Sequence, residues 1–377
     1  MISSNGFKND QGGLSFTLRL FNLLHLDPLL LFGLLLLTVA GLGVLFSAGN
    51  QSMELINRQT MRLVLAYVVM LVVAQLPSSG LKFWSPWIYS LGVLLLVLVI
   101  FAGDVGKGAQ RWLDLGFVRF QPSEMMKLAT PMMVAWFLSE RALPPRTKTL
   151  LMVAVLILLP TLLIAKQPDL GTAILIFAAG FFVLFLAGLS WKLMIGLLLS
   201  GAAMLPVLWH FMHDYQRTRV LTLLDPGRDP LGAGYHIIQS EIAIGSGGVY
   251  GRGWLNGSQS HLNFLPEQST DFIFAVFAEE FGFLGGMLLL MLYGFIIIRG
   301  LIIAAQAQDS YSRLLGGSLS LTFFVYLFVN VGMVSGILPV VGVPLPLISY
   351  GGTSMVTLMA GFGMLMSINS HRKLWSK

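Results

Sequence analysis

The chain contains no cysteine, which excludes disulfide bonds, thiolate nucleophiles, iron–sulfur clusters and zinc–thiolate sites. Charge is also scarce, since Asp, Glu, Lys and Arg make up 11% of the 377 residues, against roughly a quarter in an ordinary soluble domain. The sequence is instead 56% hydrophobic, with a mean hydropathy of +0.80. Such a composition cannot be buried in one water-soluble core, and it predicts an integral membrane protein.

The basic residues do not gather in one patch, although the net charge is +6. They are scattered between hydrophobic runs, and this argues against nucleic acid as a partner.

Apolar runs long enough to cross the roughly 30 Å hydrocarbon layer recur along the chain. They fall at 28–47, 61–77, 86–102, 122–139, 148–165, 171–188, 192–211, 271–298, 314–337 and 349–369. The predicted fold is therefore an all-α integral membrane protein of about ten transmembrane helices. Residues 1–27 are expected to form a cytoplasmic N-terminal segment, and 28–377 a single polytopic membrane domain whose first span is an uncleaved anchor.

The distribution of Lys and Arg predicts the orientation, because short cytoplasmic loops carry most of these residues. This rule makes both termini cytoplasmic. It also places a long loop, residues 212–270, on the outer side between the seventh and eighth spans, and its run YHIIQSEIAIG predicts a helix on the membrane surface. Segment 336–348 contains three prolines that forbid a regular helix, so it is expected to line a cleft.

Asp271 begins the eighth span, in the run FLPEQSTDFIFAVFAEE. A carboxylate here suits the positive end of a helix dipole, with Thr270 or Ser269 as cap. The alternative is a general base at the membrane surface, where a lipid-borne substrate presents its head group. Glu267 lies close enough in sequence to be its partner or a metal ligand.

Glu124 and Lys127 open the fourth span in QPSEMMKLA. Their i, i+3 spacing puts both on one helix face, which fits a simple ion pair. Lys127, however, lies about one turn inside the helix, where a charge must face protein or water. The two residues are therefore also a candidate functional pair.

Several cations fall in the segments predicted to lie outside. Lys107, Arg111 and Arg119 share one loop, and Arg217 and Arg219 lie in the long loop. Surface charge on a solvated loop is the simplest interpretation. Because cations are disfavoured on that side, binding of an anionic pyrophosphate is the alternative.

Asp169, in AKQPDLGT, fits a tight turn that starts a helix. It is also a candidate to hold an arginine or a metal ion beside a cationic cleft.

Glu279 and Glu280 lie deeper in the eighth span. Carboxylates inside a membrane mark proton or substrate paths or make helix–helix hydrogen bonds, and the sequence leaves both open. The glycines of GSGGVYGRG, residues 245–253, fit neither phosphate-binding pattern and predict a flexible loop.

Together these motifs resemble the shape, elongation, division and sporulation family, and its elongation members more than its division members. The matching runs are KGAQRWLDLGFVRFQPSE, QPDLGT, DYQRTRVLTLLDP, GAGYHIIQSEIAIGSGG, FLPEQSTDFIFA, AEEFG and GILPVVGVPLPLISYGG. The resemblance implies a peptidoglycan glycosyltransferase of the bacterial cytoplasmic membrane that polymerises lipid II at the outer face during elongation.

The resemblance also implies partners and site residues. The family works with a class B penicillin-binding protein transpeptidase, and other elongation-complex membrane proteins are expected. The functional aspartate of the family corresponds to Asp271, and its helix-start pair to Glu124 and Lys127. A divalent cation, Mg or Mn, would be the cofactor if the pyrophosphate is bound through a metal ion, and Glu267 and Asp169 are the residues considered above as its ligands.

Two other functions remain as alternatives. Deep carboxylates and a proline-broken span also fit a lipid II flippase, but the sequence lacks a matching pair of interrupted spans. A non-catalytic scaffold for the penicillin-binding protein is the second, but a scaffold needs no cation-lined outer cleft.

Overall fold

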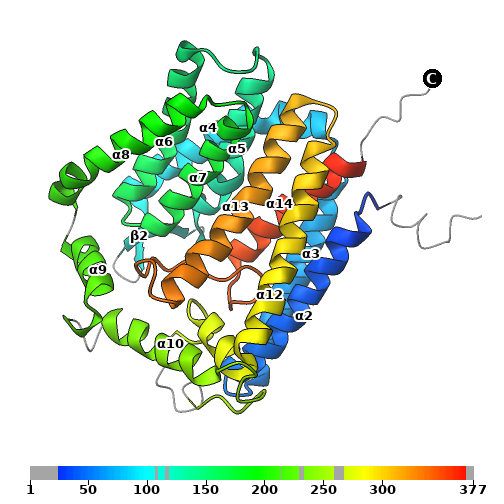
Figure 1. The fold of residues 1–377 in the computed structure, drawn as a ribbon. Coiled ribbons are helices and arrows are strands. Elements are labelled where there is room, and N and C mark those ends of the chain that lie inside the picture. The colour runs from blue at the N-terminus through cyan, green and yellow to red at the C-terminus, as the bar shows by residue number, and fades with distance from the viewer. Residues whose placement is uncertain are drawn as a thin grey trace, which may run out of the picture.

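A computed structural model of the chain describes residues 24–106, 109–114, 119–212, 214–228, 233–258 and 267–370. These residues form a bundle of helices (Figure 1). The helices are α2 (Pro28–Ala48), α3 (Met53–Ala74), α4 (Ser78–Ala102), α5 (Pro122–Ser139), α6 (Thr147–Lys166), α7 (Leu170–Leu186), α8 (Trp191–Phe211), α9 (Asp214–Leu224), the 3-10 turn η1 (Pro226–Arg228), α10 (Ala233–Gly247), α12 (Ile273–Ala305), α13 (Ser310–Val334) and α14 (Thr353–Ser370).

Every predicted apolar run carries one of these helices, and the chain is mostly helical, as expected. Six of the described helices are long and apolar enough to cross a membrane, and two shorter apolar stretches, Leu170–Leu186 and Trp191–Met204, accompany them. The chain is therefore a multi-pass membrane protein. The number of ten crossings and the cytoplasmic location of the termini stay predictions.

A short antiparallel sheet, which the all-α prediction did not include, lies between α4 and α5. Its strands are β1 (Asp104–Gly106), β2 (Ala109–Asp114) and β3 (Arg119–Phe120), in the order β1-β2-β3. The sheet gives the polar segment after α4 a defined path, because strand pairing satisfies its backbone groups.

The helix starts follow from the local sequence. Asp27 caps α2, where its carboxylate accepts from Leu30 N at 2.8 Å and Pro28 takes the first helical position. Asp169 caps α7 in the same way, accepting from Thr172 N at 3.3 Å. The turn and helix start predicted at Asp169 are confirmed.

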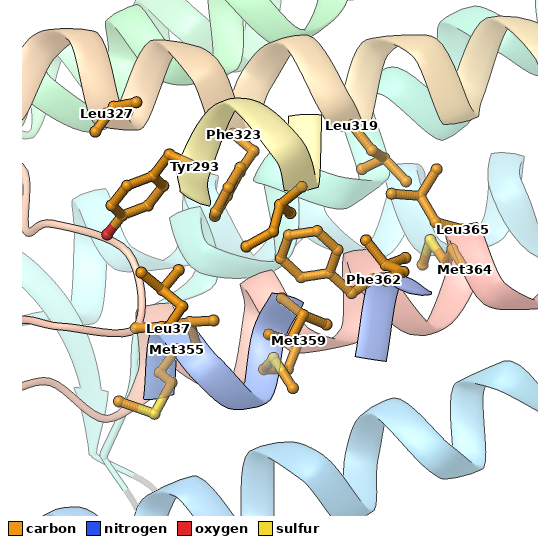
Figure 2. Close-up of a cluster of buried hydrophobic side chains, with 14 of the residues drawn as sticks. Leu37, Tyr293, Leu319, Phe323, Leu327, Met355, Met359, Phe362, Met364 and Leu365 are labelled. Carbon is orange, nitrogen blue, oxygen red and sulfur yellow. The ribbon is translucent and has the colours of Figure 1, made fainter. Parts of the chain in front are cut away.

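The core lies where α2, α12, α13 and α14 meet, as Figure 2 shows. The Phe323 and Phe362 rings pack edge to face with centroids 5.0 Å apart. Tyr293 packs beside Phe323, and its hydroxyl donates to the carbonyl of Pro346 at 2.6 Å. The core thus holds the proline-rich segment between α13 and α14.

A buried ion pair ties three helices at the opposite end of the bundle. Asp27, which is 1% exposed, accepts from Arg299 of α12 at 3.0 and 2.6 Å and from Asn369 of α14 at 3.0 Å. A bidentate arginine–carboxylate pair fixes geometry as well as charge. This end of α12 is therefore anchored to α2 and α14.

The long loop is partly helical, as predicted, and contains α9, η1 and α10. The run expected to form a helix falls within α10. In Figure 1, α10 crosses the end of the bundle, and it packs against α12.

Candidate functional site

The proline-rich segment, residues 336–352, lies at the end of the bundle that carries Asp271. It is non-helical, as predicted. Most residues from Val343 to Ser349 are buried, whereas residues 336–342 are partly or fully exposed, and their lining of a cleft stays a prediction. Burial is possible because side chains pair its backbone, as Asn330 Nδ2 does for Val343 O at 2.8 Å.

Asp271 lies in the turn that precedes α12, and its side chain is partly exposed. Its backbone carbonyl accepts from Asn330 Nδ2 at 2.9 Å. A Cβ built on Gly342 would lie 3.4 Å from Asp271 Oδ2, so the carboxylate stands beside the proline-rich segment. The N-cap of α12 is Phe272, and no side chain caps this helix. The interpretation that Ser269 or Thr270 caps α12 is therefore wrong.

Glu124 and Lys127 form a buried ion pair in the first turns of α5. Lys127 Nζ lies 2.7 Å from Glu124 Oε1, and the residues are 6% and 7% exposed. The second oxygen of Glu124 is buried and accepts no hydrogen bond within the described part of the chain. A buried charge pair with a spare acceptor is costly to keep, which makes a purely stabilising role a poor explanation.

Helix α13 connects this pair to Asp271. Lys127 Nζ lies 5.4 Å from the centre of the Tyr326 ring, and Asn330, four residues further along, binds the carbonyl of Asp271. Residues four apart are neighbours on one helix face, separated by roughly 6 Å along the axis. The ion pair and the Asp271 carbonyl therefore lie against residues one helical turn apart on the same face of α13.

Asp169 joins the same end of the bundle. It is 7% exposed and accepts from Gln121 Nε2 at 3.2 Å, while Arg111 Nη1 lies 3.8 Å from its Oδ2. Gly171, two residues later, packs closely against the proline-rich segment, since a Cβ there would lie 2.9 Å from Val341 O. Arg111 is thus the arginine that pairs with Asp169, as one of the two interpretations of Asp169 predicted.

A cavity of about 630 Å³ opens beside these residues. Its wall is formed by Arg62, Leu65, Ile88, Phe120, Gln121, Glu124, Met125, Leu128, Met132, Gly352, Thr353, Val356, Thr357, Ala360 and Met364. The wall is apolar except toward Arg62, Gln121, Glu124 and two threonines. It is thus shaped for a ligand with a long apolar part and a polar head.

Arg62 connects the cavity to the turn of Asp271. Its guanidinium lies 4.5 Å from the centre of the Tyr350 ring. Tyr350 N in turn donates to Ser269 O at 2.8 Å, and Ser349 Oγ donates to Thr270 O at 2.6 Å. Asp271, Arg62, the Glu124–Lys127 pair and Asp169 with Arg111 are therefore linked, and we call this set the polar ring.

A family model described as "Cell cycle protein", of the FtsW, RodA and SpoVE type, matches residues 19–374. The chain belongs to this family. It is 56% identical, over 354 residues, to the peptidoglycan glycosyltransferase MrdB of Escherichia coli K12, with 94% of this chain and 96% of the relative covered.

Solved structures agree with this family assignment. One is a chain from a study of how a peptidoglycan synthase complex coordinates polymerization and crosslinking. It has a TM-score of 0.80 and 31% identity, over 92% of this chain and 98% of that one. The Thermus thermophilus rod shape determining protein RodA has a TM-score of 0.70 and 28% identity, over 92% and 97%.

Two of the predicted site residues, Arg217 and Arg219, lie on α9. Arg217 donates to the carbonyls of Trp209 and His210 at 3.0 and 2.7 Å, so it closes the end of α8. Arg219 shares α9 with it, and α9 packs on η1 and α10. A role for both arginines in substrate binding stays a prediction.

Three further predictions concern the surroundings of the ring. Glu267 is exposed and accepts from Thr270 Oγ1 at 2.8 Å, so it shapes the turn before Asp271. The backbone of Arg119 lies in β3, and Lys107 lies outside the described residues. No group of three or more His, Asp or Glu side chains gathers in the part of the chain that the structure describes, and the divalent cation stays a prediction.

Sequence reasoning did not select Arg62, Gln121, Tyr326 or Asn330. Arg62 had a usable signal, because a cation well inside a membrane helix must face protein or water. The predicted span started at residue 61, whereas α3 begins at Met53. In the predicted span Arg62 is an end residue, where a cation is ordinary, whereas in α3 it lies well inside the helix.

Proposed function

We propose that this chain is a peptidoglycan glycosyltransferase that polymerises lipid II at the polar ring. The observation that carries the proposal is an apolar cavity lined by Arg62 and Glu124, two residues whose contacts lead to the turn of Asp271 and to the buried Lys127. The 56% identity to a peptidoglycan glycosyltransferase supports the reaction class. Asp271 is the proposed catalytic residue.

In the proposed reaction, a sugar hydroxyl of the acceptor attacks the anomeric carbon of the donor. A new glycosidic C–O bond forms, the bond from that carbon to the pyrophosphate oxygen breaks, and the Asp271 carboxylate takes the proton of the hydroxyl. The leaving group is undecaprenyl pyrophosphate, which departs as an anion. Cationic side chains stabilise its growing charge.

The cavity supports a place for the lipid. Its apolar wall, including Leu65, Met125 and Met364, suits the polyprenyl chain, and Arg62 and Glu124 lie where a polar head would follow. Arg62 is suited to a pyrophosphate because a guanidinium donates two parallel hydrogen bonds to phosphate oxygens. Lys127 and Arg111 provide further positive charge at the same end.

Incubation of the purified chain with lipid II in detergent tests the proposal. Polymerised glycan is the expected product. A flippase would form no polymer, and a scaffold would form none either, with or without a crosslinking partner. Absence of polymer both from the chain alone and from its complex with such a partner would overturn the proposal.

A crosslinking partner belongs to the proposal. The structural neighbour from a peptidoglycan synthase complex supports assembly with a transpeptidase, for which we propose a class B penicillin-binding protein. The proposed location is the bacterial cytoplasmic membrane, with both termini in the cytoplasm and the polar ring on the outer face.

Replacement of Arg62 by Gln is expected to raise the KM for lipid II by about tenfold or more, because a charge-assisted hydrogen bond to phosphate is lost. Initial polymerisation rates measured against lipid II concentration check this. Arg58→Gln is the matched control, since Arg58 lies on the same helix but is exposed and paired with Glu54. Equal KM values for the two variants would remove Arg62 from the site.

A further inference from the structure

Helix α12 is interrupted at Gly282, where φ is 66° and ψ is −165°. In an unbroken helix, the N–H groups of Phe283 and Leu284 would donate to the carbonyls of Glu279 and Glu280. The break separates these four groups, and each would cost free energy if left buried without a partner. It also divides α12 into a short piece, residues 273–281, that follows Asp271, and a long piece, residues 283–305.

A turn after α10, residues 247–253, pairs all four of these backbone groups. We call it the docked turn. It accepts from the two N–H groups and donates to the two carbonyls. The bonds are Phe283 N to Gly248 O at 2.9 Å, Leu284 N to Val249 O at 3.1 Å, Arg252 N to Glu279 O at 3.0 Å and Gly253 N to Glu280 O at 2.9 Å.

The glycines of the docked turn allow this close backbone contact. A Cβ on Gly247 would overlap the Ala278 carbonyl oxygen, and one on Gly251, where φ is 80°, would overlap the Glu280 carbonyl oxygen. A Cβ on Gly245, by contrast, meets nothing within 4 Å. The glycine-rich run is therefore neither a phosphate loop nor the flexible loop predicted from sequence, but a close-packed turn.

Two buried carboxylates hold the chain just beyond the docked turn. Glu279, 0% exposed, accepts from Ser258 N at 2.8 Å and from Ser258 Oγ at 3.0 Å. Glu280, 1% exposed, accepts from Leu255 N at 3.2 Å. Glu280 also accepts from the Ser47 hydroxyl of α2, which is a helix–helix hydrogen bond of the kind that the sequence allowed.

We propose that the docked turn is a positioning element for Asp271. Backbone pairing with the turn, rather than helix continuity, sets where the short piece of α12 stands relative to the long piece. The long piece is fixed at its far end by Arg299 and Asp27. The inference rests on the proposed catalytic role of Asp271, which the short piece carries.

Gly251→Ala in the full chain tests the inference, with Gly245→Ala as the matched control. A displacement of about 1 Å at a reacting group costs roughly a hundredfold in rate. We expect Gly251→Ala to lower kcat per folded protein by about 10- to 100-fold with KM for lipid II within about twofold. Gly245→Ala should match the unmodified protein.

A distance measurement separates positioning from general damage. Because the chain has no cysteine, nitroxide labels on Thr270→Cys and Ile298→Cys report, by pulsed electron paramagnetic resonance, the distance from the turn that carries Asp271 and leads into the short piece to the long piece of α12. Gly251→Ala should shift or broaden this distance distribution. Wild-type kcat, or a lower kcat with an unchanged distribution, would overturn the inference.

Glu279→Gln replaces Gly251→Ala if the latter does not accumulate in the membrane. This near-isosteric change weakens the bonds to Ser258, and a loss in kcat of roughly three- to tenfold is expected, with the same change in distance. Asp271→Asn is measured alongside. If it keeps wild-type kcat, the proposed function fails, whereas an inactive Asp271→Asn beside a fully active Gly251→Ala rejects only the docked turn.

Discussion

Lipid II polymerisation by Asp271→Asn is expected to fall by at least about a hundredfold, since general base catalysis contributes roughly 10²- to 10⁴-fold. Asparagine preserves the size of the side chain but cannot take up the proton of the attacking hydroxyl. Asp271 caps no helix, and its backbone carbonyl, which binds Asn330, is unchanged by the substitution. The loss is therefore expected in kcat, without loss of folded protein.

The measurement is the initial rate of glycan formation by purified protein, together with its thermal unfolding midpoint. Glu267→Gln is the matched control, because it neutralises an exposed carboxylate in the same turn. It should retain most of the activity. Wild-type rates in Asp271→Asn would remove Asp271 from the mechanism, and equal losses in both variants would point to the turn rather than to the base.

Lys127→Met is expected to destabilise the protein by about 3–5 kcal/mol and to abolish polymerisation. It leaves the Glu124 carboxylate buried without its partner, which is the costly way to break a buried ion pair. Reduced thermal stability in detergent would report the first effect, and the polymerisation assay the second. By itself, this variant does not separate structure from function.

The double variant Glu124→Gln, Lys127→Met makes that separation. Removing both charges together relieves the uncompensated carboxylate, so most of the lost stability should return. If the pair binds or orients substrate, the stable double variant remains inactive. Recovery of activity along with stability would show that the ion pair only supports the fold.

Much of the helical framework followed from the sequence, because long apolar runs have few alternatives in a bilayer. The positions of the helix ends do not follow from the sequence, and the start of α3 shows why this matters for the site. Residues 53–60 are polar enough to resemble a loop, yet they form the first turns of α3. With the helix start placed at residue 61, the sequence gives no reason to single out Arg62, whereas the proline at the start of α5 identifies Lys127 as a charge inside a helix.

Features that consist of backbone pairing do not follow from the sequence. The sheet β1–β3 and the docked turn are both held by main-chain hydrogen bonds. Most residue types can make such bonds, so the sequence says little about where they form. The glycines at 247 and 251 are a local sign of close packing, but their partner lies about 30 residues later, at the break in α12. One sequence without contact information cannot connect the two.

The break at Gly282 changes how α12 can respond to its surroundings. The piece from 283 to 305 is roughly 34 Å long, enough to cross the hydrocarbon layer without the short piece. A helix that tilts to match the bilayer thickness would change the depth of its tip if it were one continuous rod. Because the docked turn bonds both sides of Gly282, the short piece with the proposed catalytic Asp271 stands outside the spanning length, at an angle to the long piece that the turn sets.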